Sequence, residues 1–88
     1  MVHRVFEIKH GSNGAVREAI IRIGGEPLNN PDAQIYNGVT YYHLNKVGGS
    51  ILYDGHSRIT VGADSKDMLT DILLNFEKVS GIKMRDLR

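Results

Sequence analysis

Residues 38–61 read GVTYYHLNKVGGSILYDGHSRITV, and this stretch decides the fold. Three short segments rich in Val, Ile, Thr and Tyr are separated by Gly48 and Gly49 and then by Asp54 and Gly55. β-branched and aromatic runs divided by such dipeptides are typical of consecutive antiparallel strands joined by tight turns. The stretch therefore predicts a three-stranded antiparallel meander.

The second turn of this meander predicts which side chains are buried. A two-residue type I′ turn at Asp54 and Gly55 would pair Tyr53 with His56. Because side chains alternate across a strand, one face would carry only aliphatic residues and serines, and should be the core. The core face would then hold Leu52, Ile59 and Val61. The opposite, open face would hold Ile51, Tyr53, His56, Arg58 and Thr60.

The first turn leaves two alternatives for the first strand of the meander. An even-length loop around Gly48 and Gly49 places Val39, Tyr41 and His43 on the core face. Thr40, Tyr42 and Leu44 would then join the open face. An odd loop with a glycine bulge would exchange the two sets, and we favour the even loop.

The residues before the meander predict a strand and a helix. Residues 2–9 alternate in part and are typical of a half-buried strand. Ser12 is a candidate helix N-cap, with Asn13 as its competitor. The apolar side chains that follow recur with helical spacing at Val16, Ala19, Ile20 and Ile23. Gly24 and Gly25 can close this helix in the left-handed conformation, so we expect a helix over residues 13–23.

The residues after the meander predict a second helix. Asp64 or Ser65 can cap it, and Gly81 can end it. A wide apolar stripe runs along the segment and comprises Leu69, Ile72, Leu73, Phe76 and Val79. Residues 82–87 alternate and predict either a last strand or a loose tail. Residues 27–37 form the one long irregular stretch, in which Gln34, Ile35 and Tyr36 could make a short edge strand.

These elements predict a single α+β domain over residues 1–88. The order is β-α-β-β-β-α with a short C-terminal strand as an option. Two amphipathic helices and a mainly antiparallel sheet with one apolar face form a two-layer sandwich. Both helices should cover the same face of the sheet, which leaves the other face open.

The composition narrows the classes of function. Eleven Lys and Arg nearly balance ten Asp and Glu, so no overall charge demands a nucleic acid or an acidic membrane. The chain has no cysteine, which fits a reducing compartment. No apolar run approaches the length of a membrane span. We therefore expect a cytoplasmic, soluble domain.

Histidines and glycines offer no local catalytic or metal-binding motif. The four histidines have no HxxxH or HExxH spacing, so we expect neither a metal nor another cofactor. His43 could meet Asp54 in space, but a lone strand histidine is more often structural. Residues 10–14 could bind an anion at a helix N-terminus, although a capped strand-to-helix turn explains them better.

Two surfaces are candidates for binding. Tyrosines, histidine and arginine on an open sheet face suit recognition of a protein partner or a second copy. The residues that we expect on this interaction surface are Tyr36, Tyr42, Tyr53, His56 and Arg58. Basic residues gather near the C-terminus and could contact phosphates. This second set comprises Lys78, Lys83, Arg85 and Arg88.

From Ala15 onward the layout of helix, three-strand meander and helix resembles two nucleic-acid-directed families. These are the double-stranded RNA-binding domains and the small HicA-type toxin ribonucleases. The HicA-type pattern places Gly-Ser-His-His at the first meander strand, where this chain has GVTYYH at residues 38–43. The resemblance is one of layout and implies a nucleic-acid-binding module, with ribonuclease activity as an option, as the alternative function.

The leading hypothesis is a non-enzymatic interaction or regulatory module. It would bind a protein partner or itself through the open sheet face and the loop over residues 27–37. An enzyme acting on a small metabolite ranks third, since no pocket-forming motif is visible in so short a chain.

Overall fold

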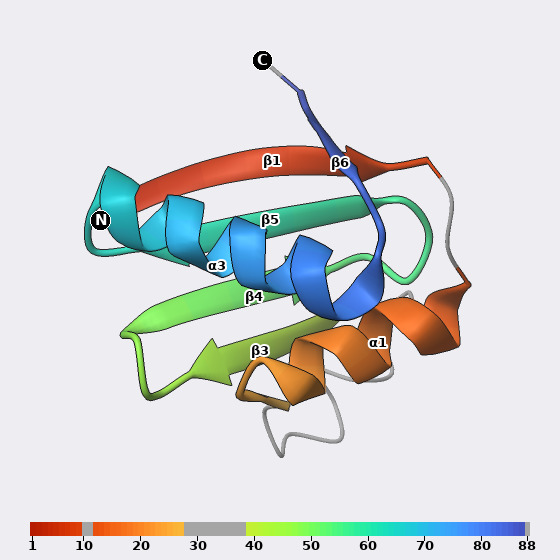
Figure 1. The fold of residues 1–88 in the computed structure, drawn as a ribbon, viewed down its shortest axis with the longest axis horizontal. Coiled ribbons are helices and arrows are strands. Elements are labelled where there is room, and N and C mark those ends of the chain that lie inside the picture. Colours follow the sequence, from red (N-terminus) through yellow and green to blue (C-terminus); the bar gives the residue numbers. More distant parts are fainter. Residues whose placement is uncertain (10–11, 28–38, 88) are drawn as a thin grey trace.

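The computed structural model describes residues 1–9, 12–27 and 39–87. The elements are β1 (Val2–Ile8), α1 (Asn13–Arg22), β2 (Gly25–Pro27), β3 (Thr40–Leu44), β4 (Gly49–Tyr53), β5 (Arg58–Ala63), α3 (Lys66–Ser80) and β6 (Met84–Asp86). They form a two-layer α+β sandwich, as the sequence predicted. Both helices lie on the same side of the sheet (Figure 1).

Within the described residues the sheet has six antiparallel strands in the order β2-β3-β4-β5-β1-β6. The meander β3-β4-β5 forms its centre, and β1 inserts between β5 and β6. The C-terminal strand that the sequence left open is therefore present. The structure adds β2, a short strand that directly follows the first helix and pairs with β3.

Local capping explains where the two helices begin and end. Ser12 accepts a hydrogen bond from the N–H of Ala15, and Ser65 accepts one from the N–H of Met68. Gly24 and Gly81 follow the helices with φ angles of 99° and 70°, in the left-handed region that glycine adopts at little cost. Ser65, not Asp64, is thus the cap of α3.

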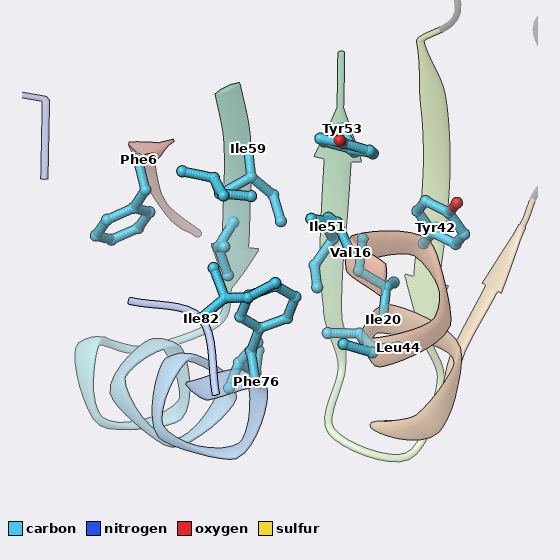
Figure 2. Close-up of a cluster of buried hydrophobic side chains, with 14 of the residues drawn as sticks. Phe6, Val16, Ile20, Tyr42, Leu44, Ile51, Tyr53, Ile59, Phe76 and Ile82 are labelled. Atoms are coloured by element: carbon cyan, nitrogen blue, oxygen red, sulfur yellow. The ribbon is translucent and has the colours of Figure 1, made fainter. Parts of the chain in front are cut away.

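The core lies between the sheet and the two helices. Val16 and Ile20 of α1 and Phe76 of α3 belong to one buried cluster with the inward side chains of the strands (Figure 2). The strand residues buried there include Phe6, Tyr42, Leu44, Ile51, Tyr53, Ile59 and Val61. The inner face of the sheet is therefore apolar, as the two-layer prediction requires.

The turn between β4 and β5 differs from the predicted two-residue turn. Tyr53 pairs with Ile59 instead of His56. The Asp54 carboxylate explains the wider turn, because its Oδ1 accepts hydrogen bonds from the backbone N–H groups of His56, Ser57 and Arg58 at 2.8, 3.0 and 3.1 Å. The Asp54 N–H also donates to the carbonyl of Arg58.

This turn shifts the register of β4 against β5 by an odd number of residues and exchanges the faces of β3 and β4. Ile59 and Val61 are in the core, as predicted, but the assignment of Leu52 to the core was wrong. Ile51 and Tyr53, predicted for the open face, are buried. The four-residue loop between β3 and β4 is even, as we favoured.

Because β3 pairs with β4 across that loop, the buried and exposed faces of β3 are exchanged as well. Thr40, Tyr42 and Leu44 are buried, whereas Tyr41 is half-buried and His43 is exposed. The assignment of all five residues to faces is therefore corrected. Across the even loop Tyr41 pairs with Leu52, so both lie on the same face, the one turned away from the core.

Candidate functional site

The face of the sheet turned away from the helices is the candidate site, and we call it the open face. Strand alternation and the pairing register place its members on one side of β3, β4, β5 and β1. These members are Tyr41, His43, Ser50, Leu52, Arg58, Thr60, Gly62, His3, Val5 and Glu7.

A row of mainly apolar side chains crosses the middle of the open face. Tyr41 pairs with Leu52, Leu52 with Thr60, and Thr60 with Val5. Leu52 is 39% exposed and Val5 is 37% exposed, although both are large aliphatic residues. The centre of the face thus leaves apolar surface uncovered by any described part of the chain.

Polar residues flank this apolar row on both sides. One neighbouring row runs from His43 through Ser50 and Gly62 to His3. On the other side, Arg58 pairs with Glu7. An apolar centre with a polar rim is the usual anatomy of a protein interface.

Gly62 brings two polar groups of the flanking row close together. A Cβ atom at this position would lie 2.9 Å from His3 Nε2 and 2.8 Å from Ser50 Oγ. The imidazole and the hydroxyl therefore share the space above Gly62, where a side chain would otherwise stand. His43 lies beyond Ser50, with its ring edge-on to Tyr41 at 5.4 Å between centroids.

The open face is hollowed on both sides of the apolar row. One hollow of about 380 Å³ is lined by Val5, Val39, Leu52, Asp54, Arg58 and Thr60. A smaller one of about 220 Å³ lies near Tyr41, His43 and Ser50. Such shallow hollows, lined by both polar and apolar residues, suit side chains of a partner better than an enclosed small molecule.

Tyr42 and Tyr53 do not belong to this surface, in contrast to the sequence prediction. They are 2% and 0% exposed and lie in the core (Figure 2). Burial is the largest cause that raises the pKa of Tyr53 above its ordinary value, and the positive charge of Arg17 opposes it. Both rings have polar partners, because Arg17 donates to the Tyr42 hydroxyl and the Tyr53 hydroxyl donates to the carbonyl of His56.

The remaining predicted surface residues have three different outcomes. Arg58 lies on the open face, and His56 is exposed in the β4–β5 turn at its edge. Tyr36 and residues 28–37 of the predicted binding loop lie outside the described residues. The sequence prediction missed Tyr41 and Leu52 because the predicted register turned β3 and β4 over. It missed Val5 because residues 2–9 alternate imperfectly between apolar and polar side chains.

Of the four basic residues predicted to contact phosphates, two line the same cavity. Lys83 and Arg85 are exposed and, together with Lys9, line a cavity of about 510 Å³ beside β6. Lys78 is exposed in the last turn of α3, and Arg88 lies outside the described residues.

The histidines and carboxylates of the described residues do not gather into a metal-binding cluster. No group of three His, Asp or Glu residues among residues 1–9, 12–27 and 39–87 could hold a metal ion. His43 pairs with Ser50, four residues before Asp54 in the chain, and the Asp54 carboxylate accepts hydrogen bonds from the turn. In the same ranges, no helix is long and apolar enough to cross a membrane.

Three comparisons with known proteins, against family models, curated sequences and solved structures, each found no match. The fold and the surface together define a small α+β domain in which one face of the sheet is turned away from the helices.

Proposed function

We propose that this protein is a small, non-enzymatic interaction module of the cytoplasm that binds a protein partner or a second copy through the open face. One observation carries the proposal. Tyr41, Leu52, Thr60 and Val5 form a continuous row across four strands, and polar residues border the row on both sides. Covering this row would remove exposed apolar surface from water, which favours association.

The charges at the rim can select the partner and its orientation. Arg58 and Glu7 pair on neighbouring strands and give this border both signs of charge. His3 and His43 mark the opposite border. Charged groups at the edge of an interface contribute more to specificity and association rate than to affinity.

The experiment places an arginine at the centre of the open face. Leu52→Arg should abolish association, because a charge would be buried without a partner in the covered interface. Leu74→Arg is the matched control, since Leu74 is 58% exposed on the outer side of α3. Size-exclusion chromatography with light scattering measures self-association. A photo-crosslinker placed at position 52 or 74 maps partners in cells.

The wild type and Leu74→Arg should form the same oligomer, and Leu52→Arg should not. If the protein is a monomer, a crosslinker at position 52 should capture a partner that a crosslinker at position 74 does not. A monomer that crosslinks equally from both positions would contradict the proposal. So would an oligomer that Leu52→Arg leaves intact while its fold, checked by circular dichroism, is unchanged.

Nucleic-acid binding is the second candidate function. The observation that favours it is the gathering of Lys83 and Arg85 with Lys9 around one cavity. Contacts with phosphates would make the affinity fall steeply with salt concentration. A gel-shift experiment at low salt that finds no complex with single- or double-stranded RNA or DNA would exclude this candidate.

A further inference from the structure

The free edge of the sheet at β6 offers backbone groups for a further strand. Leu87 donates its N–H to the carbonyl of Val5 at 3.0 Å, which places the β1–β6 hydrogen bonds on every second residue of β6. The backbone N–H of Ile8 faces β5 and not β6, because it donates to the carbonyl of Ser57 at 2.6 Å.

Met84 stands opposite Ile8 in this ladder. By the same alternation, its N–H and C=O face away from β1 and toward the outer side of β6. No described strand lies on that side, since β6 ends the strand order. An edge of this kind is a template for pairing with another extended chain.

The chemistry beside this edge is both apolar and basic. The cavity of about 510 Å³ that adjoins β6 is lined by Lys9, Gly81, Ile82, Lys83, Met84 and Arg85. Ile82 and Met84 provide its apolar wall. The three charged lining residues are all cations, and no acidic residue is among them.

We propose that the β6 edge binds an extended, acidic segment of a partner protein by strand addition. The backbone of the segment would pair with Met84, one apolar side chain would enter the cavity, and flanking carboxylates would face Lys83 and Arg85. Main-chain hydrogen bonds supply affinity in this binding mode, and pockets for alternate side chains supply specificity. Arg85 stands opposite Glu7 of the open face, but Met84 and the cavity lie at the outer edge of β6, outside the apolar row of that face. The inference therefore does not depend on the proposed function.

The same features disfavour two other occupants. A second copy that paired β6 with β6 would bring Lys83 and Arg85 near identical cations, and like charges on paired strands are destabilising. A nucleic acid would satisfy the cations, but its backbone has no alternating N–H and C=O groups to pair with Met84.

The test uses the full chain and a short labelled peptide of alternating glutamate and valine. Met84→Pro removes the outward N–H without touching the β1–β6 hydrogen bonds, and proline is tolerated at such edge positions. Met84→Ala is the matched control, because it removes the same side chain and keeps the N–H. Fluorescence anisotropy measures affinity, and the amide signals of Glu7, Arg85 and Leu87 report whether β6 stays in place.

We expect the peptide to bind and Met84→Pro to weaken binding about tenfold more than Met84→Ala does, as the loss of one hydrogen bond implies. Hydrogen exchange at the Met84 amide should slow when the peptide binds, a result that needs no variant. Lys83→Glu should weaken binding of the acidic peptide and strengthen binding of a lysine-valine peptide.

Three results would overturn the inference. The first is no binding of the acidic peptide by the wild type. The second is an equal affinity of Met84→Pro and Met84→Ala with unchanged exchange at Met84. The third is a single-stranded RNA of similar length that binds more tightly than the peptide and competes with it, which would assign the cavity to nucleic acid.

Discussion

At the scale of single residues, Arg17 contacts both buried tyrosines and so lowers the free-energy cost of burying them. Its Nη1 donates to the hydroxyls of Thr40 and Tyr42 at 2.5 and 3.0 Å. Its guanidinium carbon lies 5.2 Å from the centroid of the Tyr53 ring, within the range of a cation–π contact. A helix residue thus provides the polar partners that let Tyr42 and Tyr53 turn inward.

Replacing Arg17 tests this role. We expect Arg17→Ala to lower the free energy of unfolding by about 1–3 kcal/mol, because buried hydroxyl groups lose their partner. Arg22→Ala is the matched control. Arg22 is an exposed arginine of the same helix, 3.8 Å from Glu18, and such exposed pairs contribute about 0–1 kcal/mol. Urea denaturation measures both, and equal losses would contradict the role of Arg17.

At the scale of the elements, the β4–β5 turn sets the register of the sheet. Burial, the largest single effect, disfavours the charged form of Asp54. The N–H groups of His56, Arg58 and Ser57, with the nearby His56 side chain, outweigh it and hold the pKa of Asp54 below its ordinary value of 3.8. The negative charge of Asp54 therefore stabilises the turn that decides which faces of β3 and β4 are buried.

The turn has a predictable dependence on pH. Because the pKa of Asp54 is lower in the folded than in the unfolded chain, its contribution is complete above the unfolded value. It is lost as pH falls from there through the folded value. Asp54→Asn should remove this part of the acid sensitivity. Asp54→Ala should also cost about 1–3 kcal/mol at neutral pH through lost hydrogen bonds.

The measurement is urea denaturation of the wild type and both variants across the acid range. If Asp54→Asn and the wild type lost stability in parallel as pH fell, the charge of Asp54 would have no part in holding the turn.

At the scale of the whole molecule, two helices and one sheet face share a single core. Phe76 of α3 is 1% exposed and packs among residues from the strands and α1 (Figure 2). A chain of 88 residues has limited stability, roughly 0.05–0.15 kcal/mol per residue. One large cavity can therefore cancel a large part of it.

We expect Phe76→Ala to lower the free energy of unfolding by about 3–5 kcal/mol, the usual cost of deleting a buried phenylalanine. Leu74→Ala, two residues earlier on the exposed side of α3, should change it by no more than about 0.5 kcal/mol. Thermal unfolding followed by circular dichroism compares them. Similar melting temperatures for the two variants would contradict a core centred on Phe76.

Much of the fold could be predicted from local patterns. The apolar stripe ending at Val79 and the caps at Ser12, Ser65 and Gly81 predicted both helices, because helix ends depend on nearby backbone groups. Both helices lie on one face of the sheet, as their single apolar stripes required. The inward positions of Ile59 and Val61 were predicted correctly as well.

The candidate site needed the tertiary structure. A strand in which both faces carry apolar side chains can bury either face, so the buried face of β3 and β4 depended on one turn. The Asp54 carboxylate made that turn wider than a two-residue hairpin. The buried Tyr53 ring also contacts Arg17, which is distant in the sequence. The sequence by itself determined the elements and their two layers, since these follow from periodicity and capping. The structure alone decided that Tyr41, Leu52 and Val5 form the open face, because register depends on contacts between distant residues.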